Sequence, residues 1–287
     1  GVTGVQTCAL PISEGGRLGK LVTTRSDELA GEHRVAVARL EEEEGLRVLA
    51  GYMGRAAEEL RGEAAARRLV ALCCGNPAQL RSVAALCKKK GAAPALAYLE
   101  QCRQKLRRPK LPDAEGYGTL FDALAGSLAF LREQDNALAE RCTMLAVFPE
   151  DSQVPLSVVG QLWGTDEVET EEAVTELESW HLVDVDWSER RKVGMDSEGG
   201  DSEDEDDPRW EGRTLSLIDL HLDYLRASAK DDLARWHAGL LRRCGRRVLG
   251  EREEGRADDE YWANSTNVWH HMAGCGEELA AVMAASG

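Results

Sequence analysis

From Glu41 onward the apolar residues of the chain recur with the period of an α-helix, and this pattern restricts the fold to a mainly α one. Leu46, Leu49 and Met53 fall three and then four residues apart, so they share one face of a helix. Residues 117–131 place their leucines on one face in the same way. Aromatic residues make up only 5% of the chain, while Ala, Leu and charged residues dominate, and such a composition favours helices.

Proline and turn residues divide this helical pattern into segments. Asn76 and Pro77 are expected to cap and begin a helix over residues 77–90, because Asn accepts hydrogen bonds from free amides and Pro is tolerated at the first helical position. Pro149 ends another helix. Thr170, followed by acidic residues, is the expected N-cap of a helix that runs to Trp180. The other helices are expected over residues 41–53, 60–73, 95–106, 138–148, 158–163, 231–244 and 260–283.

Strand patterns are short and few. Residues 18–24 form an apolar, β-branched run and residues 34–40 alternate, so both are expected to be strands. Residues 182–186 alternate as well, and residues 214–220 are the expected partner in a two-stranded ribbon.

An acidic insertion, about residues 188–212, interrupts this ribbon. Residues 196–207 hold eight carboxylates and no basic side chain. Such a tract cannot bury enough apolar surface to order itself, so a disordered loop is expected. Ser202 precedes Glu203-Asp-Glu, an acidic context that suits an acid-directed kinase.

Charge and cysteine content exclude several classes of protein. The formal net charge is −16, and an acidic chain repels phosphate backbones, so no nucleic-acid partner is expected. No apolar stretch approaches the ~18 residues that a membrane span requires, so no membrane partner is expected. The eight cysteines show no Cys-x-x-Cys spacing, which favours reduced thiols in a cytoplasmic protein.

Short segments occur in a distinctive order along the chain: Lys20-Leu-Val-Thr-Thr-Arg25, Gly75-Asn-Pro77, Leu145-Ala-Val-Phe-Pro-Glu-Asp151 with Trp163 beyond it, and Leu217-Ile-Asp-Leu-His-Leu-Asp-Tyr-Leu225. In this order and spacing they resemble the C-terminal half of an NB-ARC nucleotide switch. The likeness is closest to the apoptotic protease-activating factor family of STAND NTPases. It covers about residues 14–287 and includes the helical pattern between the motifs.

The resemblance implies a division of the chain into domains. Residues 1–13 look like a translated sequencing adapter and are set apart. The implied parts are a remnant of the α/β P-loop NTPase domain over residues 14–40, a helical domain over 41–112, a winged-helix domain with a two-stranded wing over 113–228, and the start of a second helical domain over 229–287.

The resemblance also implies which residues contact nucleotide. Arg25, preceded by Thr24, matches the family's Thr-Thr-Arg motif, whose Arg senses the terminal phosphate, and a guanidinium fork suits phosphate oxygens. Pro77 matches the Pro of a Gly-x-Pro motif that packs on the adenine side of the nucleotide. The residue pattern itself also allows Pro77 to be no more than the start of a helix.

The last motif departs from the family at one position. Leu217-Ile-Asp219 falls where the family has Met-His-Asp or Leu-His-Asp, and the family's His holds the β-phosphate of ADP. Ile218 occupies the His position and cannot donate a hydrogen bond. Either the off-state is weakened, or His221 compensates from three residues further on; otherwise His221 is a partly exposed helix residue. Asp219 keeps the motif's acid and is expected to cap a helix.

The implied function is that of a fragment of a signalling switch. The cofactor is ADP or ATP, with Mg²⁺ in the full-length parent, and the partners are protein effectors and further copies of the parent in a homo-oligomer. The fragment itself is not expected to hydrolyse ATP: Gly15-Gly-Arg-Leu-Gly-Lys20 ends like a P-loop, but Glu14 and Leu21 stand where Gly and Ser or Thr are required. No catalytic residues are expected.

No metal site is expected at His270-His271 either, because adjacent side chains diverge on a helix.

Two alternatives remain open at this point. The chain could be a DNA-binding regulator that uses the winged helix, although the helix ending at Trp180 carries several glutamates and no base. It could also be an orphan helical scaffold that binds no nucleotide, since Ile218 and the absent P-loop both allow this.

Overall fold

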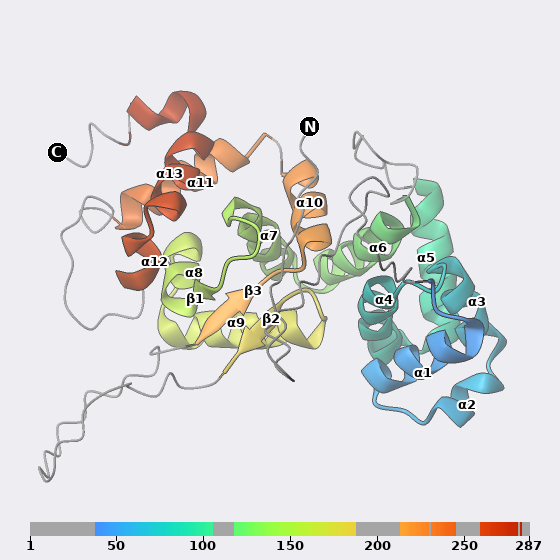
Figure 1. Cartoon of the computed structure of the whole chain (residues 1–287). Helices are drawn as coiled ribbons and strands as arrows, with labels where there is room; N and C mark the ends of the chain where they lie inside the picture. The colour runs from blue at the N-terminus through green and yellow to red at the C-terminus, as the bar shows by residue number, and fades with distance from the viewer. Residues whose placement is uncertain are drawn as a thin grey trace, which may run out of the picture. The chain divides into compact units, whose positions relative to one another are not determined.

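The computed structural model describes residues 38–105, 118–187, 213–229, 231–244, 259–280 and 282. The chain divides into two compact units, Gly1–Arg39 and Leu40–Gly287, and every helix and strand named below belongs to the second (Figure 1). The expected strand over residues 18–24, with Thr24 and Arg25, and the acidic insertion over residues 188–212 lie outside the described residues. None of the described helices is long and apolar enough to cross a membrane.

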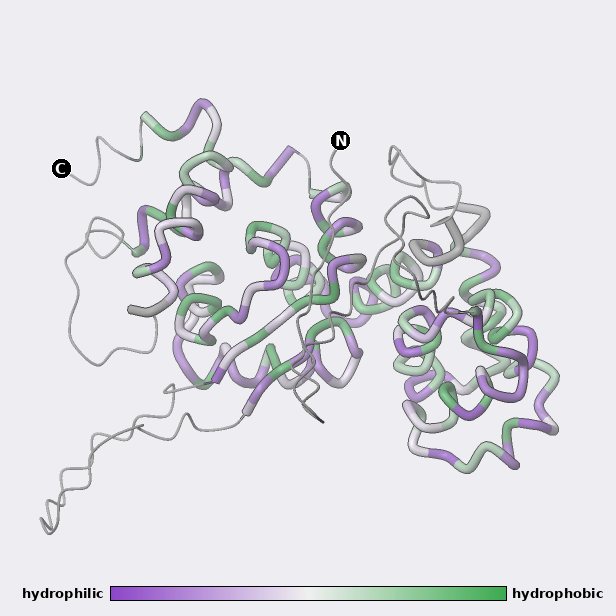
Figure 2. Tube along the Cα trace, in the orientation of Figure 1, coloured by the Kyte–Doolittle hydropathy of each residue, from purple (hydrophilic) through white to green (hydrophobic). Residues whose placement is uncertain are grey.

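The first group of helices packs around α4. This group comprises α1 (Glu42–Met53), α2 (Ala57–Arg61), α3 (Ala64–Leu72), α4 (Pro77–Lys90), α5 (Ala92–Lys105) and α6 (Gly118–Gln134). Helix α4 packs against α1, α5 and α6, because its apolar residues lie on more than one face. Leu80, Val83 and Leu86 of α4 are completely buried. Figure 2 shows how apolar and polar residues alternate along these helices.

The expected single helix over residues 60–73 is wrong, because the chain forms α2 and α3 there instead. Gly62 ends α2 and Glu63 adopts an extended backbone as the N-cap of α3. Gly is a poor helix former, so it favours an interruption at this point. Residues 38–40, the end of the expected strand over residues 34–40, have no regular structure in the described part of the chain.

The second group of elements surrounds a small sheet. It contains α7 (Asn136–Met144), the 3-10 turn η2 (Leu145–Val147), β1 (Val154–Pro155), α8 (Leu156–Trp163), α9 (Glu167–Ser179), β2 (Asp184–Asp186), β3 (Thr214–Ser216) and α10 (Asp219–Ser228). The sheet is antiparallel with the strand order β1-β3-β2, and Leu215 of β3 lies opposite both Val154 and Val185. The expected pairing of residues 182–186 with 214–220 is therefore present, but β1 adds a third strand. A strand as short as β1 has no alternation by which it could be recognised.

Two boundaries in this group differ from the expected ones. Thr170 is not the N-cap of α9; Asp166 is, and its carboxylate accepts a hydrogen bond from the amide of Glu169 at 2.9 Å. Thr170 lies one turn inside the helix, where it is buried and its hydroxyl donates to the carbonyl of Asp166 at 2.7 Å. The strand expected over residues 214–220 ends at Ser216, because α10 begins at Asp219.

The last helices cover α8 and η2. They are α11 (Leu233–Cys244), α12 (Asp259–Ala263), α13 (Ser265–Gly274) and the 3-10 turn η4 (Gly276–Glu278). The expected helix over residues 260–283 is thus divided, because a new helix begins after Asn264. The side chain of Asn264 caps α13 by accepting a hydrogen bond from the amide of Thr266. The ring of Phe148 packs edge-on against Tyr261 and His271 at centroid distances of 6.2 and 6.0 Å.

The cysteines in the described ranges are thiols that form no disulfide bond: Cys73, Cys74, Cys87, Cys102, Cys142, Cys244 and Cys275. All but Cys74 are buried and serve as small apolar side chains of the core.

Candidate functional site

The turn before α4 is held by backbone contacts. Gly75 has a φ of +64°, which favours glycine, and its carbonyl accepts a hydrogen bond from the amide of Leu40 at 3.0 Å. A Cβ atom at Gly75 would clash with the backbone of Leu40. The glycine therefore allows the chain at Leu40 to lie directly against the start of α4.

Asn76 and Pro77 begin α4 as the sequence predicts. The Asn76 Oδ1 atom accepts hydrogen bonds from the amides of Ala78 at 2.9 Å and Gln79 at 3.3 Å. The amide of Leu80 donates to the Asn76 carbonyl at 3.1 Å. Pro77 has no amide hydrogen, so the first turn has no free donor for a phosphate. Pro77 is exposed and offers an apolar ring instead, which suits contact with the flat face of a base.

Ile218 lies at the N-cap position of α10. Its carbonyl accepts hydrogen bonds from the amides of His221 at 2.8 Å and Leu222 at 3.1 Å, while its side chain is half-buried and caps nothing. Asp219 is the first helical residue, so the expectation that Asp219 caps the helix is wrong by one position. At the first turn its negative charge still interacts favourably with the helix dipole.

His221 is buried, with only 2% of its surface exposed, so the alternative of a partly exposed helix residue is wrong. Its Nδ1 atom lies 3.1 Å from the carbonyl oxygen of Leu182, and its Nε2 atom lies 3.1 Å from the hydroxyl of Ser82. A carbonyl only accepts, so Nδ1 carries the proton and donates. Nε2 then has a lone pair that accepts from the Ser82 hydroxyl, whose proton is shared with the Ala78 carbonyl at 3.2 Å. Burial lowers the pKa of His221 to about 4, so the ring is neutral at pH 7.

Both ring nitrogens of His221 are therefore used within the protein. For His221 to contact a phosphate in place of the missing family His, it would have to leave both Ser82 and Leu182. The described residues of the last motif thus offer no free hydrogen-bond donor in the position of Ile218 or His221.

A second contact joins α4 to the sheet beside His221. The Arg81 guanidinium donates to both carboxylate oxygens of Asp184 in β2, with Nη1 at 2.9 Å from Oδ2. This bidentate geometry is the strongest form of such an ion pair. Ser82 and Arg81 are adjacent on α4, one turn after Pro77. The structure thus brings the Pro77 helix and the His221 helix together, whereas Arg25 and Thr24 lie outside the described residues.

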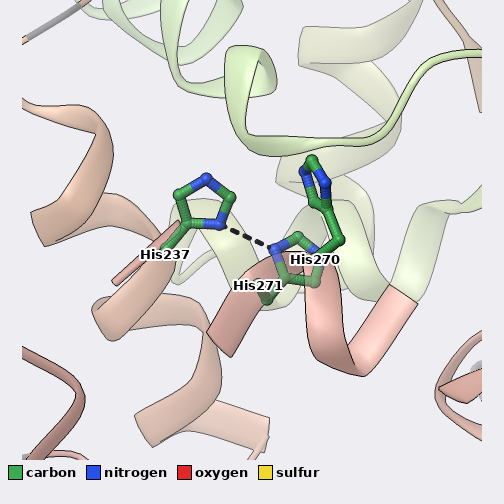
Figure 3. A group of neighbouring side chains, drawn as sticks. All are labelled: His237, His270 and His271. Atoms are coloured by element: carbon green, nitrogen blue, oxygen red, sulfur yellow. Dashed lines mark hydrogen bonds between the residues drawn. The ribbon is translucent and has the colours of Figure 1, made fainter. Parts of the chain in front are cut away.

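A histidine cluster that the sequence discounted lies further along the chain. His237 of α11 meets His270 and His271 of α13, and one ligand atom from each side chain lies within 4.8 Å of the others (Figure 3). The sequence argument considered only the divergence of His270 and His271, so it missed the third ring. A separation of more than thirty residues between His237 and the pair gives no local signal. Among the described residues, this is the one group of three or more His, Cys, Asp or Glu side chains close enough together that it could hold a metal ion.

The described residues define a mainly α-helical chain with a small antiparallel sheet, and no family model matches it. The chain is similar to apoptotic protease-activating factor 1 of Danio rerio, with 27% identity over 272 residues that cover 92% of the chain. It spans 19% of the length of that protein. The similarity supports a relationship between the chain and this protein.

Proposed function

We propose that the chain is the C-terminal part of an NB-ARC nucleotide switch in an apoptosome-like signalling regulator. The similarity to apoptotic protease-activating factor 1 along 92% of the chain carries the proposal. In this proposal α1–α5 form the helical domain and α6–α10 with the sheet form the winged helix. The order of α7, α8, α9 and the ribbon β2–β3 is consistent with a winged helix. Helices α11–α13 begin the second helical domain.

In the proposed switch, ADP lies between domains of the full-length protein. The exposed ring of Pro77 contacts the adenine, and Arg25 contacts the terminal phosphate. The ion pair of Arg81 with Asp184 and the hydrogen bond of Ser82 with His221 stabilise the closed arrangement. ATP and Mg²⁺ favour an open arrangement in which α10 and β2 separate from α4. This open form assembles into a homo-oligomer, which recruits protein effectors in the cytoplasm.

The acidic helix α9 argues against the alternative of a DNA-binding regulator. Its glutamates pair with basic side chains of the protein itself: Glu169 with Arg141, Glu171 with Arg213, and Glu176 with Lys89. The basic side chains next to α9 are thus already paired with its carboxylates, which leaves them unable to bind a phosphate backbone at the same time.

The proposal is tested first by the transcript upstream of Ser13, read from RNA. We expect it to encode a strand, a Gly-x-x-x-x-Gly-Lys loop followed by Ser or Thr, and an acidic strand that binds Mg²⁺. The encoded protein should then copurify with ADP. A protein that includes this upstream region but has no such loop and retains no nucleotide would refute the proposal.

Replacing Pro77 with alanine in that longer protein should weaken ADP retention about three- to tenfold, because the apolar contact with the base is reduced. The matched control is Asn76→Ala, which removes the side-chain cap and should destabilise the protein by about 1 kcal/mol while leaving ADP affinity unchanged. The measurement is the dissociation constant of a fluorescent ADP analogue. An equal effect of both variants would assign Pro77 a purely structural role.

Replacing Ile218 with histidine should slow ADP release by about tenfold or more, because a hydrogen bond to a charged phosphate contributes about 1.5–3 kcal/mol. The Ile218 side chain is half-buried, so the position can accept an imidazole that reaches solvent. Ile218→Leu is the control, since it supplies no donor and should leave release unchanged. Stopped-flow displacement of labelled ADP measures the rate, and identical rates for both variants would remove position 218 from the phosphate site.

A further inference from the structure

The histidine cluster of His237, His270 and His271 has features of a metal-binding site. Among the described residues it is the one group of three or more His, Cys, Asp or Glu side chains whose ligand atoms lie within 4.8 Å of one another. The three rings come from two helices, α11 and α13; those of His237 and His271 face each other, and the His270 ring lies beside them (Figure 3).

Hydrogen bonds outside the cluster orient two of the rings. His270 Nε2 lies 2.9 Å from the carbonyl oxygen of Val147, so this nitrogen carries the proton and Nδ1 has a free lone pair. His271 Nε2 lies 2.8 Å from the hydroxyl of Tyr261, which leaves its Nδ1 for the centre of the cluster. Metal-binding histidines in proteins have this arrangement, in which the second nitrogen bonds a carbonyl or another fixed polar group.

The distance between the central nitrogens is close to what an ion requires. His237 Nδ1 and His271 Nδ1 lie 2.9 Å apart, a spacing at which one proton is shared between them. Two ligands about 2.0–2.1 Å from a tetrahedral ion are separated by about 3.4 Å. Exchange of the proton for an ion therefore needs ring movements on the order of 1 Å or less.

The surroundings keep the three rings neutral and in place. The ring of His271 packs against those of Phe148, Tyr261 and Trp262. Desolvation by burial is the main cause that lowers the pKa of each histidine in the cluster, and neutral imidazole is the form that binds metals. Gly274 also matters, because a Cβ atom there would clash with the His237 ring. The glycine lets the end of α13 approach that ring.

We propose that His237, His270 and His271 bind a divalent late first-row transition-metal ion, with Zn²⁺ as the best-suited ion. The donors are imidazole nitrogens without a carboxylate, which suits zinc and copper and disfavours Mg²⁺ and Ca²⁺. Water supplies the fourth ligand, since His270 is only half-buried. The ion would join α11 to α13 beside the turn η2, and it does not depend on the nucleotide proposal.

The test uses the whole chain with any affinity tag removed, because a histidine tag would itself bind metal. Titration with ZnCl₂ should show one ion per chain, and the Tm should rise by about 5 °C or more at a hundredfold excess over the Kd. Co²⁺ should give the visible absorption of a four-coordinate nitrogen site. MgCl₂ at the same concentration should leave the Tm unchanged.

Variants identify the ligands. His270→Gln keeps an amide that can donate to the Val147 carbonyl but removes the ligand, so it should weaken Zn²⁺ binding by at least about tenfold. Gly274→Ala retains every imidazole yet displaces the His237 ring, and it should weaken binding too. His181→Asn removes a remote imidazole at a left-handed position that Asn tolerates, and it should bind Zn²⁺ like the unmodified chain.

Circular dichroism in the absence of metal shows whether each variant folds. Stoichiometric Zn²⁺ binding that survives both His270→Gln and His237→Gln would overturn the proposal. Absence of any Zn²⁺-dependent change in Tm for the folded, unmodified chain would overturn it as well.

Discussion

Replacing Phe148 with alanine lowers the free energy of unfolding by about 3–5 kcal/mol, a range typical of large aromatic residues removed from a core. The Phe148 side chain is 0% exposed. Directly after η2, its ring packs against Tyr261 of α12 and His271 of α13. The cavity cannot close easily, because the carbonyl of Phe148 is held by the Arg226 guanidinium at 2.8 Å. Urea unfolding followed by circular dichroism measures the change.

Trp269 is the matched control for Phe148. It is also aromatic and lies on α13, but 67% of its surface is exposed. Trp269→Ala should change the free energy of unfolding by no more than about 0.5 kcal/mol, as surface substitutions usually do. A similar loss in both variants would mean that α13 does not pack on η2 through Phe148.

Most helices could be predicted from the sequence, because their apolar residues follow a local period. The boundaries of α4 illustrate this: Asn76, Pro77 and the glycine after Lys90 are capping signals that act within a few residues. The misplaced start of α9 has a physical reason as well. Asp166 and Thr170 are both good capping residues, and only tertiary packing decides that Thr170 is buried.

The candidate sites could be predicted only in part, because they depend on contacts between distant segments. The cap at Asn76 is local and was predictable. The burial of His221 depends on Ser82 and Leu182, which are far from it in the sequence, so a helical pattern alone could not reveal it. The convergence of His237 with His270 and His271 is a tertiary contact of the same kind. Polar residues that are buried by distant partners leave no periodic signal.

The position of His221 has a consequence for how the chain responds to acid. Burial is the main cause that lowers its pKa to about 4. The hydrogen bond to the Leu182 carbonyl opposes this effect, and the charges of Arg81 and Asp184 have smaller effects that lower and raise the pKa, respectively. The unfolded chain has the ordinary pKa of about 6.5, so between these two values the unfolded state binds more protons than the folded state. The stability that the neutral ring contributes is therefore complete above pH 6.5 and is lost as the pH falls towards 4.

The His221→Asn variant should reduce this pH dependence. The Asn amide can still donate to the Leu182 carbonyl, so at pH 7.5 the variant should be less stable by about 1–3 kcal/mol, through the lost Ser82 contact and the smaller side chain. Between pH 6.5 and 4 the free energy of unfolding of the unmodified chain should fall by about 3 kcal/mol through the titration of His221. The variant lacks this titration, so the two free energies of unfolding approach each other and cross. Urea midpoints at pH 7.5, 6 and 5, with a chelator present, measure the difference.

Ser82→Ala separates the titration of His221 from its hydrogen bond. It removes the hydroxyl but leaves the buried imidazole, so the variant should lose stability at every pH and keep the full slope between pH 6.5 and 4. The buried cluster of His237, His270 and His271 also favours the neutral form, so the His221 variant should retain the part of the slope that belongs to that cluster. Parallel curves for His221→Asn and the unmodified chain would show that His221 titrates with an ordinary pKa. They would also show that its ring is not held between α4 and the segment before β2.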